Sequence, residues 1–155
     1  MEQNKHNGQS HGCSDLLFGC MDFRLRPAID EFLEPYISNG GCDEVRFPGV
    51  AKALLDDQTG PVALGAIRIG VEKHGVQRVM LVNHRDCGAY GGTAAFHSPE
   101  VERAQHEGDL RKAAELLHKE FPSITVDLYF AETRDNGKTF KVEPIREGVS
   151  VPRRN

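Results

Sequence analysis

Two short segments far apart in the chain contain side chains that commonly bind metal ions. The first is Cys20-Met-Asp-Phe-Arg24 and the second is His84-Arg-Asp-Cys87-Gly88. Two thiolates and one imidazole are good zinc ligands, and three protein ligands leave the fourth tetrahedral position for water. A water molecule held there has a pKa of roughly 7, which gives hydroxide at neutral pH. We therefore predict that Cys20, His84 and Cys87 bind Zn²⁺.

Asp22 and Arg24, in the first segment, suit the control of such a water molecule. Asp22 lies two residues after Cys20, and Arg24 lies two residues after Asp22, so an extended turn would direct the three side chains to one side. Arg24 can hold the Asp22 carboxylate bidentately and keep it ionised. Two roles for Asp22 remain open: it accepts the proton of the water, or it binds the zinc as a fourth ligand and closes the site.

Both segments are expected at the same edge of a sheet. Residues 15–19 form a short apolar run before Cys20, and residues 77–83 form the best-defined strand, which ends before His84. A further strand is predicted over 43–47. The helices between these strands are expected over 25–37, 50–57 and 60–74. Alternating strands and helices favour a mostly parallel sheet, in which ligands gather at the carboxyl ends of the strands.

The C-terminal half adds a long helix and a hairpin. Residues 99–121 predict one long polar helix or two shorter ones. Two β-rich segments, 124–130 and 139–142, flank Asp135-Asn-Gly-Lys138, which is a tight-turn sequence. The predicted fold class is therefore α/β, with a mostly parallel central sheet flanked by helices and an antiparallel edge strand.

Composition limits the classes of protein to consider. The 155 residues are 39% hydrophobic and 27% charged, as in an ordinary globular domain. A net charge of −4 and a pI near 6.0 imply no basic surface for nucleic acid. No apolar run approaches the roughly 18 residues that a membrane helix needs. The four cysteines are spaced irregularly, which favours reduced thiols and a cytoplasmic location over a disulfide framework.

We expect three regions along the chain: a flexible N-terminal arm over residues 1–13, a single zinc-binding domain over 14–148, and a C-terminal tail over 149–155. His6, His11 and Cys13 in the arm are more consistent with a solvated tail than with a metal site. The arm is polar and lacks the apolar core of a signal peptide.

The remaining cysteines and histidines have weaker signals. Cys13 and Cys42 have no companion at a useful spacing and are expected to be core or surface thiols. A cysteine-based redox function has little support, because the chain has no Cys-x-x-Cys. Asp86 is expected either to contact a metal ligand or to form a salt bridge in solvent. Three histidines are expected to be exposed: His97, His106 and His118.

The combination of the two segments resembles the β-class carbonic anhydrases. Cys20-x-Asp22-x-Arg24 followed by His84-x-x-Cys87-Gly88 carries the resemblance, and the order of elements matches over roughly residues 15–129. The resemblance implies that Cys20, His84 and Cys87 hold zinc, with Asp22 and Arg24 as a switching pair. It also implies reversible hydration of carbon dioxide to bicarbonate by zinc-bound hydroxide, and a homodimer or higher homo-oligomer with its sites near the subunit interface.

One stretch departs from the family pattern. Family members usually carry Arg-Asn-Ala-Gly after the second strand, whereas this chain has Arg46-Phe47-Pro48-Gly49, which makes the pocket wall more apolar. Two alternatives follow: a hydrolase of carbonyl sulfide or carbon disulfide, and a non-catalytic protein whose structural or sensing zinc is closed by Asp22. The residues expected around the substrate are Phe23, Phe47, Gly49, Gly88 and Tyr90.

Overall fold

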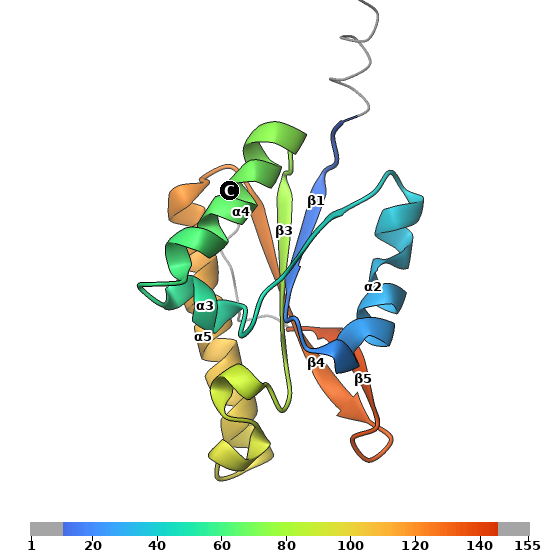
Figure 1. Cartoon of the computed structure of the whole chain (residues 1–155), viewed down its shortest axis with the longest axis vertical. Coiled ribbons are helices and arrows are strands. Elements are labelled where there is room, and N and C mark those ends of the chain that lie inside the picture. Colours follow the sequence, from blue (N-terminus) through green and yellow to red (C-terminus); the bar gives the residue numbers. More distant parts are fainter. Residues whose placement is uncertain (1–10, 146–155) are drawn as a thin grey trace, which may run out of the picture.

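A five-stranded sheet forms the centre of the molecule (Figure 1). The computed structural model describes residues 11–145. The strands lie in the order β2-β1-β3-β4-β5, and only the β4–β5 pair is antiparallel. Their bounds are β1 Asp15–Gly19, β2 Asp43–Arg46, β3 Arg78–His84, β4 Thr125–Arg134 and β5 Thr139–Pro144. The predicted α/β fold, with its antiparallel edge strand, is confirmed.

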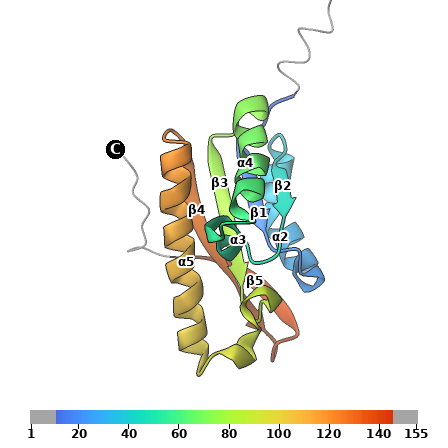
Figure 2. The same cartoon turned by 60° about the vertical axis from the view of Figure 1, so that its left-hand side comes forward.

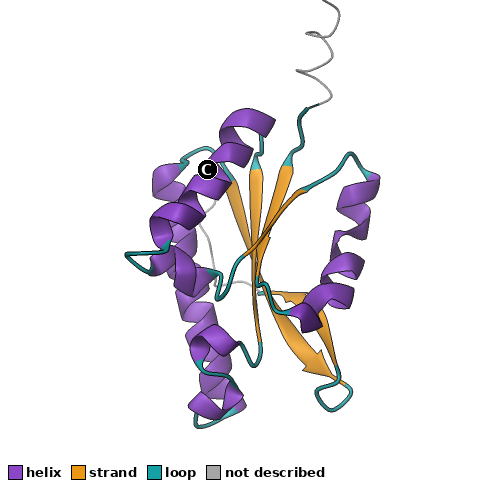
Figure 3. Ribbon diagram, in the orientation of Figure 1, coloured by secondary structure: helices purple, strands orange, loops and turns teal. Residues whose placement is uncertain are grey.

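Helices cover both faces of the sheet, as the colouring in Figure 3 shows most plainly. Helix α2 lies on one face, whereas α3, α4 and α5 lie on the other (Figures 1 and 3). Their bounds are α2 Arg26–Ser38, α3 Ala51–Leu55, α4 Gly60–His74 and α5 Pro99–Glu120. Three short 3₁₀ helices complete the described chain: η1 Phe23–Leu25, η2 Gly88–Tyr90 and η3 Thr93–Ala95.

The central strands are apolar on both faces because both faces are covered. In β1, Leu16, Leu17 and Phe18 are all buried, and in β3 the whole segment 79–84 is buried. Such continuous burial is typical of parallel strands between two helical layers, and it explains why these runs do not alternate. The strongest strand signals in the sequence therefore come from β1 and β3, the strands that lead into the two segments of predicted metal ligands.

Helix α5 is a single helix that runs beside β4 (Figure 2). Ser98 caps its first turn, since the Ser98 hydroxyl accepts a hydrogen bond from the Val101 amide at 3.1 Å. Its buried stripe consists of Glu102, His106, Leu110, Ala113, Ala114 and Leu117. Two polar side chains therefore begin a stripe that is otherwise apolar, and both lie near the turn that follows β3.

Some boundaries differ from the predictions. Strand β4 continues to Arg134 instead of ending at residue 130, because residues 131–134 pair with β5. Of the predicted N-terminal arm, residues 1–10 lie outside the described chain, as does the predicted tail over 149–155. Cys13, by contrast, is attached to the domain: its amide donates to the His74 carbonyl at 3.0 Å. No helix in residues 11–145 combines the length and apolar character needed to cross a membrane.

Candidate metal centre

The three predicted ligands meet at the carboxyl edge of the sheet. Cys20 directly follows β1, His84 is the last residue of β3, and Cys87 lies in the turn after it. Because β1 and β3 are paired neighbours, the two turns lie side by side. One ligand atom from each residue lies within 4.8 Å of the other two. All three side chains are buried, with exposed fractions of 4%, 0% and 2%.

The His84 ring is oriented as a metal ligand. Its Nδ1 atom lies 2.8 Å from the Arg85 carbonyl oxygen, so Nδ1 carries the proton and donates, leaving a lone pair on Nε2. The Nε2 atom is buried and has no hydrogen-bond partner among the described residues. A buried acceptor without a partner is costly unless something else binds it. The Phe140 ring packs edge-on at 5.8 Å and fixes the orientation.

The Cys20 and Cys87 thiols interact with each other and with nearby backbone amides. Contact with the Cys87 thiol lowers the pKa of Cys20, and the same contact raises the pKa of Cys87. Backbone amides near the sulfurs favour the charged forms: Gly49 for Cys20, and Ala89 and Tyr90 for Cys87. A soft divalent cation between the two sulfurs would favour both thiolates. The donor set and the buried lone pair thus fit Zn²⁺.

Asp22 and Arg24 form a tight ion pair beside these ligands. The Arg24 Nη2 and Nε atoms donate to Asp22 Oδ2 at 2.6 Å and 3.1 Å, and the Arg24 amide donates to Oδ1 at 2.9 Å. The Arg24 side chain is the main reason that the pKa of Asp22 is lowered. Asp22 Oδ2 lies 3.9 Å from His84 Nε2. The carboxylate is therefore ionised and adjacent to the ligand cluster.

Asp86 contacts Arg24 through both its carboxylate and its carbonyl oxygen. Arg24 Nη1 donates to the Asp86 carboxylate at 3.0 Å, and Nη2 donates to its carbonyl oxygen at 2.9 Å. Asp86 has a positive φ of 62°, and its other carboxylate oxygen accepts from the Thr93 amide at 2.8 Å. This left-handed conformation is strained for a non-glycine residue, so the Thr93 contact helps to hold it. Asp86 thereby fixes the position of the arginine that holds Asp22.

Glu102 and His106 of α5 contact the end of β3 and the turn after it, a role that the sequence did not predict for either residue. The buried Glu102 carboxylate accepts from Arg85 Nη1 and from the Asp86 amide, both at 2.8 Å. His106 is fully buried, which corrects the expectation that it is exposed. Burial lowers its pKa to about 4, and its Nδ1 atom lies 2.8 Å from Asn83 Nδ2. Glu102 and His106 lie one helical turn apart on the buried stripe of α5, and this spacing is the sequence signal that could have indicated their burial.

The structure places the five expected substrate-pocket residues in different surroundings. Phe23 is 84% exposed, so in a single chain it belongs neither to the core nor to an enclosed wall. Phe47 is half-buried and packs 6.3 Å from the Phe18 ring. Gly88 is exposed. Gly49 has a φ of 83°, and a Cβ atom added there would lie only 3.0 Å from the Ala89 Cβ atom.

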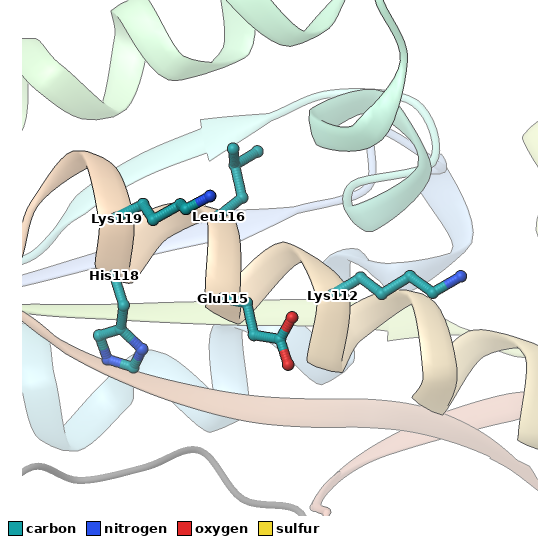
Figure 4. A pocket seen from close by; sticks show the side chains of 5 residues that line it. All are labelled: Lys112, Glu115, Leu116, His118 and Lys119. Carbon is teal, nitrogen blue, oxygen red and sulfur yellow. The ribbon is translucent and has the colours of Figure 1, made fainter.

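Tyr90 has its hydroxyl engaged elsewhere. It donates to Asp109 at 2.8 Å and accepts from Asn83 at 3.2 Å, while its ring lies 4.0 Å from the His106 ring. Two cavities of about 470 Å³ are lined by residues other than these five. One is lined by Arg24, α2 and the β4–β5 hairpin, and the other lies on α5 (Figure 4), lined by Lys112, Glu115, Leu116, His118 and Lys119.

The fold and the cluster together define an α/β protein with a buried Cys-His-Cys cluster at the carboxyl ends of its parallel strands. Residues 11–146 match the family described as "Putative carbonic anhydrase". The chain therefore belongs to this carbonic anhydrase family, as a divergent relative of the β class. The resemblance on which the sequence analysis rested is confirmed.

Individual relatives agree with this assignment. An uncharacterized protein of Rickettsia conorii is 31% identical over 129 residues, covering 79% of this chain and 69% of its own length. One from Rickettsia bellii is 29% identical over 119 residues, covering 73% of each chain. The crystal structure of the β-carbonic anhydrase CafA of Aspergillus fumigatus matches with a TM-score of 0.58 at 14% identity. That match covers 97% of this chain and 88% of CafA, and it supports the fold.

Proposed function

We propose that the chain is a zinc-dependent carbonic anhydrase that reversibly hydrates carbon dioxide to bicarbonate. The observation that carries the proposal is the unpartnered Nε2 of His84 in the buried Cys20–His84–Cys87 cluster, next to a carboxylate that Arg24 holds. When bound there, zinc supplies Lewis acidity that brings the pKa of a water molecule to roughly 7. Membership of the carbonic anhydrase family supports the same reaction.

In this proposal Asp22 and Arg24 control protonation. The lowered pKa of Asp22 keeps its carboxylate ionised at neutral pH, so it can accept a hydrogen bond or a proton from water near His84 Nε2. Arg24 holds that carboxylate through several donors and is held by Asp86 in turn. Asp22 is thus a candidate catalytic residue, and Arg24 positions it.

The proposal extends to assembly and location. A single domain over residues 14–148 would pair as a homodimer, and the exposed Met21 and Phe23 on either side of Asp22 are apolar side chains that a second subunit would cover. All four cysteines are free in the structure, which fits the reducing cytoplasm.

Asp22 also motivates a second candidate, a non-catalytic zinc protein. Its Oδ2 atom is already 3.9 Å from His84 Nε2, so a small movement would make Asp22 a fourth zinc ligand and close the site. X-ray absorption distinguishes the two. A lasting shell of two sulfurs, one nitrogen and one carboxylate oxygen at high pH favours the closed protein, whereas an exchangeable water favours the enzyme.

The principal test combines metal analysis with a hydration assay on the same sample. Cys20→Ser is expected to lose one zinc per chain relative to the wild type, whereas Cys42→Ser, which alters a thiol outside the cluster, keeps it. Stopped-flow carbon dioxide hydration at about pH 7 and about pH 8.5 then measures activity. A wild type that holds zinc but shows no rate above buffer at either pH would rule out the enzyme.

The same sample tests the hydrolase alternative. The apolar Phe47 and Pro48 beside Gly49 are its motive, because a linear apolar molecule needs no hydrogen bonds from that wall. Release of sulfide from carbonyl sulfide or carbon disulfide without carbon dioxide hydration would favour that reaction over the proposed one.

A further inference from the structure

A second cluster of metal-ligand residues lies at the opposite edge of the sheet. Cys13 precedes β1, Asp43 is the first residue of β2, and His74 is the last residue of α4. One ligand atom from each lies within 4.8 Å of the other two. Three segments that are distant in the sequence therefore bring a thiol, a carboxylate and an imidazole to one point.

Contacts of the protein itself hold these groups in place. His74 Nδ1 lies 2.7 Å and 2.9 Å from the two Asp43 carboxylate oxygens. The Cys13 amide donates to the His74 carbonyl at 3.0 Å, which fixes the chain beside the end of α4. Asp43 pairs in register with Leu16 of β1. The Asp43 and His74 side chains are each 26% exposed, so the cluster is accessible but not fully solvated.

A further histidine lies beside the cluster. The His11 ring centroid is 4.8 Å from that of His74, with the planes tilted by 39°. His11 is exposed, so its ring can reorient without disturbing the core. An imidazole nitrogen that could serve as a fourth donor therefore lies next to the other three groups.

We propose that Cys13, Asp43 and His74 form a second zinc site, with His11 as its fourth donor. A thiolate, an imidazole and a carboxylate are all established zinc ligands in tetrahedral sites, whereas Mg²⁺ and Ca²⁺ select oxygen alone. Four protein donors close the coordination shell, which is the arrangement of a structural site.

This site is separate from the metal centre at the carboxyl edge. The two clusters share no residue, and β1 lies between them. The five residues of β1 span about 16 Å at roughly 3.3 Å per residue. One ion therefore cannot serve both clusters. Zinc at the second site joins the chain ahead of β1 to β2 and α4, and so stabilises the folded state by binding it alone.

The test is a zinc titration of full-length, untagged, metal-free protein against a competing chelator. The wild type is expected to take up about two equivalents, and Cys13→Ser about one. This variant leaves the Asp43–His74 pair intact, which protects its folding. Cys42→Ser alters a neighbouring thiol outside the cluster and is expected to match the wild type. His11→Asn is expected to keep the second equivalent with about 10-fold weaker affinity.

A Cys20→Ser background separates this site from the proposed enzyme. There the second equivalent is expected to persist, and zinc raises the thermal midpoint by several degrees, roughly 2–8 °C. Adding Cys13→Ser is expected to abolish that rise. Equal zinc uptake by the wild type and Cys13→Ser overturns the site, as does binding of the second equivalent only at about millimolar zinc. Neither outcome depends on carbon dioxide hydration.

Discussion

The Nε2 atom of His84 and the Oδ2 atom of Asp22 lie 3.9 Å apart. The first carries a buried lone pair without a hydrogen-bond partner in the described chain, and the second belongs to a carboxylate that Arg24 keeps ionised. An ion bound to His84 would therefore lie within reach of Asp22. Arg24, which holds Asp22 in place, would consequently control access to the fourth coordination position of such an ion.

Arg24→Lys is expected to lower the hydration rate by about 10–100-fold while zinc is retained. Lysine keeps the positive charge but cannot offer the Asp22 carboxylate several donors at once. Stopped-flow rates over a range of pH, with zinc measured on each sample, provide the test. Arg26→Lys is the matched control, because Arg26 pairs with Asp30 on the exposed side of α2. Equal losses in both variants would contradict a positioning role for Arg24.

Glu102→Gln is expected to lower the free energy of unfolding by about 2–3 kcal/mol. The Glu102 carboxylate is fully buried, and its two oxygens accept hydrogen bonds from Arg85 and from the Asp86 backbone amide. The glutamine side chain has only one oxygen that can accept, so it cannot replace both contacts. Urea unfolding measures the change. Glu100→Gln, in the exposed first turn of the same helix, is expected to have little effect. If Glu102→Gln left the free energy of unfolding unchanged, the turn after β3 would need no support from α5.

Glu132 gives a pH-dependent prediction. Its ion pair with Arg85 lowers the pKa of the Glu132 carboxyl from 4.5 to about 2. A folded-state pKa below the unfolded value stabilises the protein at pH values above 4.5, and that stabilisation is lost as the pH falls towards 2. Glu132→Gln should therefore cost about 1–3 kcal/mol near neutral pH and much less at about pH 2.

Urea unfolding of wild type and Glu132→Gln at several pH values measures this difference. Glu115→Gln, on the exposed face of α5, serves as the control with a constant and small effect. A Glu132→Gln effect of equal size at both ends of the pH range would mean that the side chain stabilises by packing, not by its charge.

Phe23→Arg is expected to convert a dimer into a monomer. Phe23 is 84% exposed and Met21 is 61% exposed, and a charged side chain in a buried interface would be strongly unfavourable. Light scattering at micromolar concentration should give about twice the chain mass of 17.2 kDa for the wild type and the single mass for the variant. Ile37→Arg is the control, because Ile37 is also apolar and 59% exposed but lies away from Asp22, and it is expected to leave the dimer intact. A monomeric wild type would contradict the proposed assembly.

The sequence predicted the parts of the fold that depend on local patterns. The buried runs at β1 and β3, the glycine-ended α4 and the tight turn at 135–138 are each specified by residues within the element. The end of β4 was missed because residues 132–134 pair with β5 alone, whereas residues 125–131 also pair with β3. Strand pairing in the exposed part of a hairpin leaves a weaker signal in the sequence than a buried apolar run does.

The sequence likewise predicted only the residue clusters that have a recognisable spacing. The spacing of Cys20, His84 and Cys87 indicated a cluster, and neighbouring parallel strands bring the three together. The group formed by Cys13, Asp43 and His74 has no recognisable spacing, because its members come from three unrelated segment ends. Only the strand order reveals that those ends meet.

Arg24 binds two carboxylates at once, those of Asp22 and Asp86. If Asp22 moved towards His84, Arg24 would keep its contacts with Asp86, including the one with the Asp86 carbonyl oxygen. The Arg24 guanidinium would still be paired with the Asp86 carboxylate. Release of Asp22 would therefore cost less free energy than breaking an isolated ion pair. In that case Asp86 would keep its contacts with Arg24, and Asp22 would be the carboxylate that moves.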